Sequence, residues 1–292
     1  MHSPSDPFIQ QVSQAGQQID EVGHVTLPGF FSAAELSAFE ACVVDLFLLQ
    51  AQKIGEYRAR ALALRADAGL SNREKFCAIY EMMELDDKEA LYQVQKFLTS
   101  SPAARALFNA RFLALTGELL GSAPNCVLVD GPALFVNRPN TQRLLYKWHS
   151  EAHYYPKRRR FLNVWLPLFD RKTRHNGTMS FKQCSHKVDF PFAEYQGYNK
   201  DSHNKANHFI QYEIPASLLG GYSEHWCETS PGDLVVFHRS LVHTSNQNLS
   251  DDYSVAVVAR VWDPSDDLTL SGAMAATPYG GNIGRPNLVV NA

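Results

Sequence analysis

Trp148-His149-Ser150-Glu151 is followed, about ninety residues later, by Leu241-Val242-His243-Thr244-Ser245. A histidine and a carboxylate two residues apart, with a second histidine much later, can meet around one divalent metal ion inside a β-barrel. Such a set occupies one face of the ion and leaves the opposite coordination positions open, as in non-haem iron oxygenases. The two segments therefore predict a rolled β-sheet core that carries a metal centre.

The spacing within the first segment suits a β-strand. Side chains alternate across a strand, so His149 and Glu151 would both point into the barrel while Ser150 faces outward. The second histidine, His243, follows a turn at 230–233 and a predicted strand at 234–237, which brings it near in space. We expect His149, Glu151 and His243 to be the metal ligands.

Other histidines remain alternatives, because the chain has 11 of them and chance pairs are easy to form. His153 shares the predicted strand face of Glu151, and His238 ends the strand before His243. His153 is better placed to contact the substrate than to bind the metal. A hydrogen-bonded role in the core, or a place on the surface, is the simpler interpretation of any single histidine.

The chain changes character near Gly121. Residues 33–120 have helical apolar spacings, and three helix starts occur at Ser32-Ala33-Ala34-Glu35, Ser71-Asn72-Arg73-Glu74 and Ser101-Pro102. Strands are predicted at 126–130, 133–137, 161–168, 232–237 and 253–261, separated by Pro and Gly turns.

The whole chain, 1–292, is predicted to form one domain of α+β class with a mainly β core. Its helix-rich part covers about 1–120 and its barrel core about 121–265. Residues 187–230 lack a clear period and are rich in aromatic, Asn, His and Gly residues. We interpret them as a lid, because loops of this length in compact proteins are usually functional.

Composition excludes several classes of protein. The formal net charge is only −3, which does not favour nucleic acid or an anionic membrane as partner. The N-terminus lacks the basic and apolar blocks of a signal peptide, and no apolar run is long enough to span a membrane. Five widely spaced cysteines predict free thiols, and a cytoplasmic location is expected. The sequence contains no signal for the oligomeric state.

A basic stretch runs through the middle of the chain. Between Lys147 and Lys187 it has ten Lys and Arg residues against Glu151 and Asp170. One interpretation is that Lys157–Arg160 hold an anionic substrate such as a CoA thioester, a phosphorylated sugar or a nucleotide-linked metabolite. The simpler interpretation is a solvated strand edge, where cations discourage edge-to-edge pairing. Nucleic acid is less suitable still, because no aromatic stacking pattern accompanies the charges.

Four blocks of the chain together resemble the phytanoyl-CoA dioxygenase family. They are Glu21–Leu36; Trp148–Pro156; Asn163–Asp170 with Asn176–Met179 and Ser185–Lys187; and Pro231–Phe237 through His243–Ser245. The resemblance implies a double-stranded β-helix, a barrel of jelly-roll or cupin type with N-terminal helices packed on it. It also implies Fe(II) as cofactor, with 2-oxoglutarate and O2 as co-substrates.

The family's metal ligands match His149, Glu151 and His243. Glu151 stands where the family more often has Asp, and a retained carboxylate favours hydroxylation over halogenation. The resemblance further implies that Trp165 and Ser245 contact 2-oxoglutarate. For Trp165, simple packing in the core is nearly as good an interpretation.

One departure concerns the distal carboxylate of 2-oxoglutarate. The family has an arginine about eleven residues after the distal histidine, and this chain has Ser254 there. Arg260 lies on the same strand face if no bulge intervenes, so it is our candidate for the salt bridge. Arg143 or Arg160 could serve instead, or 2-oxoglutarate could bind weakly or not at all.

The sequence therefore predicts an iron(II)/2-oxoglutarate-dependent oxygenase. It would hydroxylate an unactivated C–H bond of a small, possibly anionic metabolite and release succinate and CO2. Candidate substrate contacts are His153, Tyr154, Tyr155 and Tyr222. Two alternatives stay open: an inactive barrel that binds or regulates, and a cupin-type metalloenzyme that does not use 2-oxoglutarate.

Overall fold

The computed structural model describes residues 7–84, 94, 96–140, 145–156, 159–196 and 210–263. Its helices are α1 (Pro7–Val22), α2 (Ala33–Ala51), α3 (Arg58–Ala66), α4 (Asn72–Glu84), α6 (Pro102–Leu107), α7 (Ala110–Leu120) and α8 (Glu151–Tyr154). Its strands are β1 (His24–Leu27), β2 (Leu128–Asn137), β3 (Phe161–Leu168), β4 (Met179–Lys182), β5 (Ala193–Gln196), β6 (Ile210–Glu213), β7 (Glu224–Trp226), β8 (Leu234–His238), β9 (His243–Ser245) and β10 (Ser254–Trp262). Apart from β1 and α8, helices come first and strands follow, as the sequence predicts.

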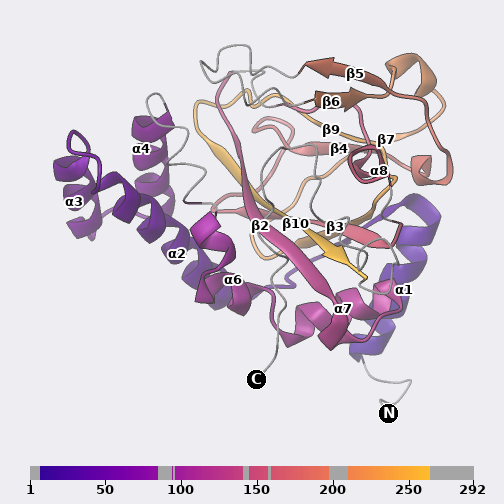
Figure 1. Cartoon of the computed structure of the whole chain (residues 1–292), viewed down its shortest axis with the longest axis horizontal. Coiled ribbons are helices and arrows are strands. Elements are labelled where there is room, and N and C mark those ends of the chain that lie inside the picture. The colour runs from indigo at the N-terminus through magenta and orange to yellow at the C-terminus, as the bar shows by residue number, and fades with distance from the viewer. Residues whose placement is uncertain are drawn as a thin grey trace.

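Two antiparallel sheets form the core of the molecule (Figure 1). The larger sheet has the order β1-β8-β3-β10-β2, and the smaller has the order β7-β4-β9. Strand β1 pairs with β8, so a segment from the N-terminal region completes the edge of the larger sheet. A separate pair, β5 and β6, lies beyond the smaller sheet (Figure 1).

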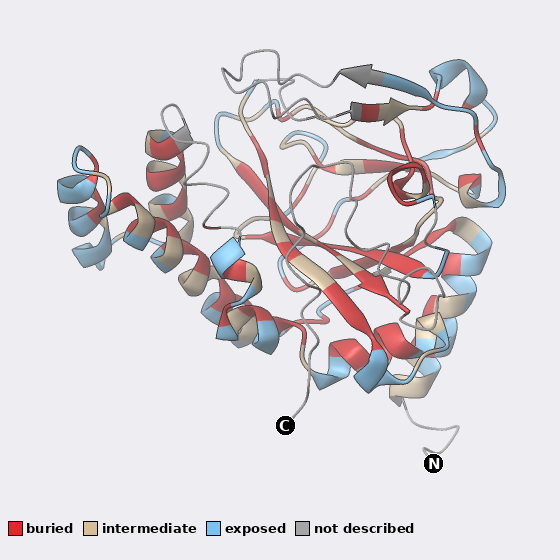
Figure 2. Cartoon of the chain, in the orientation of Figure 1, coloured by how far each residue is buried: buried red, intermediate tan, exposed pale blue. Residues whose placement is uncertain are grey.

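Alternation along β10 separates two environments. One set of its side chains joins the main hydrophobic core under the helices: Val255, Val257, Ala259 and Val261. The other set lines a cavity between the two sheets: Ser254, Ala256, Val258 and Arg260. Figure 2 shows these central strands buried along most of their length. One strand therefore links the helical layer to the interior of the barrel.

The helices pack on the outer face of the larger sheet through a cluster of aromatic rings. Phe76 of α4 stacks on Tyr80, meets Phe47 of α2 edge-on at 5.2 Å, and lies 5.1 Å from Phe169 after β3. Capping boxes begin the first two predicted helices, at Ser32 and at Ser71, with the Glu three residues on closing each box. The helical layer and the barrel thus share one core.

One strand prediction and the lid interpretation need correction. The predicted strands at 126–130 and 133–137 belong to one strand, β2, which begins only at Leu128 and pairs with β10 on both sides of a β-bulge. The segment 187–230, interpreted as a lid, supplies β7 to the smaller sheet, so its last part belongs to the barrel. Residues 197–209 of that segment lie outside the described part of the chain, and the single-domain boundaries stay a prediction.

Two further predictions concern the cysteines and membrane-spanning helices. All five cysteines are free, as expected. Among the described helices, none combines the length and apolarity that a transmembrane span requires.

Replacement of Phe76 by Ala should test the shared core. Phe76 is fully buried, so its removal leaves a cavity that costs roughly 3–5 kcal/mol of unfolding free energy. The control is Leu49→Ala on α2, where the side chain is 43% exposed and the change should be within about 0.5 kcal/mol. Urea unfolding measures both, and equal values for the two variants would contradict a core shared by helices and barrel.

Candidate metal centre

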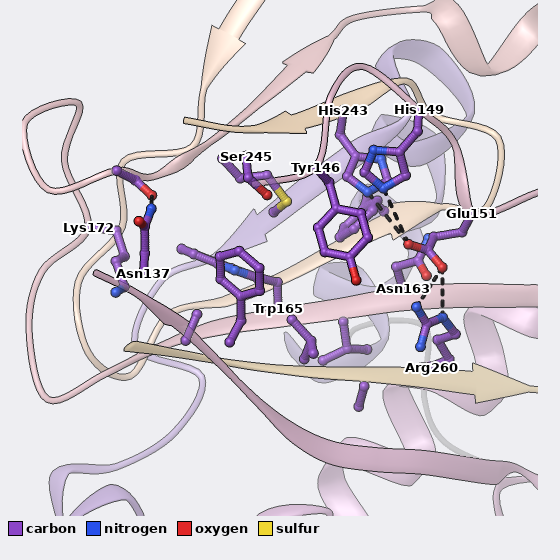
Figure 3. Close-up of a pocket in the computed structure, with 18 of the residues that line it drawn as sticks. Asn137, Tyr146, His149, Glu151, Asn163, Trp165, Lys172, His243, Ser245 and Arg260 are labelled. Carbon is purple, nitrogen blue, oxygen red and sulfur yellow. Dashed lines mark hydrogen bonds and ion pairs between the residues drawn. The ribbon is translucent and has the colours of Figure 1, made fainter. Parts of the chain in front are cut away.

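His149, Glu151 and His243 lie together at one end of the cavity between the sheets (Figure 3). Glu151 Oε1 is 3.6 Å from His149 Nε2 and 3.8 Å from His243 Nε2. A divalent ion such as Zn²⁺ binds N and O ligands at about 2.0–2.2 Å, so two ligand atoms of one ion are at most roughly 4.4 Å apart. Both distances are below that limit, and the three groups therefore fit one ion.

Backbone pairing places the two histidines side by side. His149 N donates to His243 O at 3.0 Å, and His243 N donates to His149 O at 2.9 Å. This isolated β-bridge joins residues that are far apart in the sequence. It explains why the two imidazole centroids lie only 4.2 Å apart.

The prediction of a strand through 149–151 is wrong, although the expected side chains do converge. Ser150 is buried, and Glu151 begins the single helical turn α8. After His149 the facing chain is the turn at His238–Leu241, which offers Arg239 O to Ala152 N at 3.0 Å and no continuing ladder. The chain therefore turns away, and Glu151 reaches the site from a helix N-terminus.

Each histidine is oriented as a ligand by its second ring nitrogen. The Nδ1 atom of His149 lies 2.6 Å from Lys147 O, and that of His243 lies 2.9 Å from Leu241 O. A carbonyl can only accept, so Nδ1 carries the proton and Nε2 presents its lone pair to the centre. Burial and the neighbouring His149 lower the pKa of His243 to about 3, which keeps its imidazole neutral and ready to bind.

Arg260 holds the carboxylate of Glu151. Its Nε and Nη2 atoms donate to Glu151 Oε2 at 2.9 and 2.6 Å, which leaves Oε1 for the metal (Figure 3). Burial alone would raise the pKa of Glu151, but the Arg260 guanidinium and the two histidines hold the pKa well below its usual range. The guanidinium also lies over the Tyr155 ring, 5.0 Å from its centroid, which favours the cation.

This geometry shows how Arg260 relates to the predicted 2-oxoglutarate site. Arg260 does line the cavity on the same face of β10 as Ser254, as expected. The β-bulge between Val258 and Arg260 affects the pairing with β2, while the register with β3 continues unbroken. Its guanidinium, however, is engaged by Glu151 and lies beside the metal ligands.

The opposite end of the cavity carries a lysine that the sequence analysis counted only as part of the basic stretch. Lys172 is 2% exposed, and its Nζ contacts Ser254 Oγ. Its backbone pairs with Thr229 in both directions, at 2.7 and 3.2 Å. Burial lowers the pKa of Lys172 to about 7. The signal that could have identified it is Ser254, which stands where the family resemblance implies an arginine and contacts Lys172.

Trp165 and Ser245 line the cavity between these two ends (Figure 3). Trp165 also packs on Val235, Phe237 and neighbouring apolar groups, so it contributes to the core as well. Two further lining residues escaped the sequence analysis. Tyr146 lies 5.3 Å from the His149 ring, and Asn163 has a buried Nδ2 without a hydrogen-bond partner among the described residues.

The predicted substrate contacts lie around the cavity, and none of the four is among the described residues that line it. His153 stacks on Phe192 at 4.1 Å, and Tyr222 meets Phe190 at 5.5 Å. The Tyr154 hydroxyl accepts from Tyr212 N at 3.2 Å. Tyr155 packs under Arg260, as described above.

The alternative ligands are separate from this centre. His238 lies against His186, with ring centroids 5.3 Å apart. In the described part of the chain, only His149, Glu151 and His243 form a cluster that could hold a metal ion. Arg160 pairs with Asp263 at 2.7 Å and does not line the cavity. Arg143, Lys157, Arg158, His203 and His208 lie outside the described residues.

Replacement of Arg260 by Ala should weaken metal binding. Without the guanidinium, Glu151 loses both donors that orient its carboxylate, and loss of such a partner typically costs 10–100-fold in metal affinity. Arg260→Lys should restore part of the affinity, because one charged donor returns. Titration with Fe(II) or Co(II) measures the effect, with the exposed Arg105→Ala on α6 as control. Wild-type affinity in Arg260→Ala would contradict this role.

Comparison with known proteins agrees with the geometry. The family model described as phytanoyl-CoA dioxygenase matches residues 19–254. Among solved structures, EctD from S. alaskensis with 2-oxoglutarate and 5-hydroxyectoine has a TM-score of 0.55 at 18% identity, covering 100% of this chain and 86% of that one. The epimerase SnoN, in complex with Fe3+, alpha ketoglutarate and nogalamycin RO, has a TM-score of 0.52 at 17% identity, covering 89% and 86%. No curated protein sequence matches the chain.

The match extends over most of the chain and includes all three clustered ligands. It confirms the predicted double-stranded β-helix with helices packed on it, and the predicted class of non-haem iron enzyme that uses 2-oxoglutarate. The chain belongs to the phytanoyl-CoA dioxygenase family.

Proposed function

We propose that this protein hydroxylates an unactivated C–H bond of a small metabolite, with 2-oxoglutarate and O2 consumed and succinate and CO2 released. The observation that carries the proposal is the buried cluster of His149, Glu151 and His243, which leaves the cavity side of the centre open. Iron in this centre supplies the activation of oxygen. The protein supplies position, exclusion of water and selectivity.

The cavity has the size and lining for a small keto acid. It encloses about 150 Å³. One water needs roughly 10–15 Å³ on the same measure, so the space holds on the order of ten small groups. Trp165 and Ser245 flank it between the metal ligands and Lys172, and we assign them to contact with 2-oxoglutarate. Trp165 supplies an apolar wall, and Ser245 a hydroxyl.

The substrate site is proposed next to α8, below the described part of 187–230. His153 stacks on Phe192 and Tyr222 packs on Phe190, so both side chains meet this segment. We retain His153 and Tyr222 as candidate substrate contacts. Tyr154 accepts a hydrogen bond from Tyr212 and Tyr155 packs against Arg260. Both would therefore shape the wall of the substrate site. Similar solved structures hold small molecules, nogalamycin RO in SnoN and 5-hydroxyectoine in EctD, which supports a metabolite over a macromolecule.

Loss of the metal ligand His149 should abolish the centre. Anaerobic wild-type protein with Fe(II) and 2-oxoglutarate should develop a weak visible charge-transfer band. In His149→Ala the band should be absent and metal affinity should fall by more than about 100-fold. The control is His175→Ala, an exposed histidine.

The same titration separates the competing functions. A spectrum that responds to metal but ignores 2-oxoglutarate would indicate a cupin-type enzyme that does not use the keto acid. Failure of the wild type to bind any divalent metal would indicate an inactive barrel. Succinate release in air, dependent on His149, would support the oxygenase.

A further inference from the structure

Lys172 is buried, and in the described part of the chain it has no carboxylate partner. Removal of an ammonium group from water costs several kcal/mol unless a counter-charge compensates. Among the described residues no carboxylate lies within 4.0 Å of Lys172 Nζ, and its polar contact is the neutral Ser254 hydroxyl. The charged groups that act on it oppose each other, since Asp170 favours the ammonium and Arg73 disfavours it. A bound anion would compensate a buried charge of this kind, so Lys172 indicates a binding site for an anionic ligand.

The position of Lys172 identifies the anion. It lines the same cavity as the metal ligands and stands at the far end from them, with Trp165 and Ser245 between (Figure 3). A keto acid that binds a metal through its keto and first carboxylate groups extends a second carboxylate away from the metal. In this cavity that second carboxylate would extend toward Lys172.

Two other observations favour Lys172 over the arginine. Ser254 occupies the strand position where the family resemblance predicts an arginine, and Lys172 Nζ touches its hydroxyl. Lysine thus reaches that place from the loop after β3, through the space a serine leaves open. Arg260 already donates twice to Glu151 and is not available at the far end.

We propose that Lys172, held by Ser254, binds the distal carboxylate of 2-oxoglutarate in place of the missing arginine. This inference rests on the proposed function. It makes the site selective for keto acids with a second carboxylate, and it assigns Arg260 to the positioning of Glu151 alone. A lysine contributes a single charged donor, where arginine would give a paired contact.

A distinctive pH dependence follows from the burial of this lysine. Its pKa in the free protein is about 7, and a bound carboxylate raises it. Binding is therefore strongest below pH 7, where the ammonium is present before the ligand arrives. Above pH 7 the affinity should fall by about tenfold per pH unit until the pKa of the complex is reached. Arginine at this position stays charged and should remove that dependence.

The test is an anaerobic titration of iron-saturated protein with 2-oxoglutarate, followed by the charge-transfer band. Lys172→Met keeps the length of the side chain and removes its charge, and should weaken binding by at least about 30-fold. The affinity of Lys172→Arg for 2-oxoglutarate should stay constant between pH 6.5 and 8.5. The matched control is the exposed Lys187→Met. Pyruvate, which lacks the second carboxylate, should bind equally to wild type and Lys172→Met.

Folding does not confound this test, because Met in place of a buried unpaired ammonium should leave the thermal midpoint equal or higher. Wild-type affinity of Lys172→Met for 2-oxoglutarate would overturn the inference and leave the proposed function intact. The inference would also be overturned if metal-saturated Arg260→Ala lost affinity for 2-oxoglutarate while Lys172→Met kept it. Absence of any response of the wild type to 2-oxoglutarate would instead overturn the proposed function.

Discussion

The two hydrogen bonds between the backbones of His149 and His243 are the contact on which the rest of the site depends. They join the segment before α8 to β9 and place two imidazoles next to each other. Carbonyls two residues before each histidine then hold the rings in the ligand tautomer. Glu151 can complete the centre only because the chain turns into α8 directly after this bridge. The metal site is therefore a property of backbone pairing more than of side-chain contacts.

The charges inside the cavity are arranged in two groups. Glu151 and Arg260 neutralise each other at the metal end. Lys172 at the far end has no such partner among the described residues. The cavity consequently favours a ligand that brings negative charge to both ends, one to the metal and one to the lysine. A keto acid with two carboxylates meets both requirements, and the apolar walls between them suit its short carbon chain.

The helical layer contributes rigidity to this arrangement. Alternate residues of β10 face either the helices or the cavity, so packing on one side restrains the positions on the other. Arg73 of α4 pairs with Asp170 and with Asp252, at 2.7 Å for the latter, and thereby ties a helix to the two loops that flank Lys172 and Ser254. The loop that presents the lysine is thus held by the N-terminal half of the chain.

The sequence by itself determined the order of helices and strands, the capping boxes and the identity of the three clustered ligands. The helices and strands depend on local patterns, apolar periodicity and cap residues, and the ligands on the order of motifs that resemble one family. The tertiary structure alone decided which groups Arg260 and Lys172 contact. Arg260 turned out to face Glu151, and Lys172 to face Ser254, because both choices depend on how a loop and a helical turn fold back over the strands. Sequence spacing places a side chain on a face of a strand, but only the packed barrel decides what that side chain reaches.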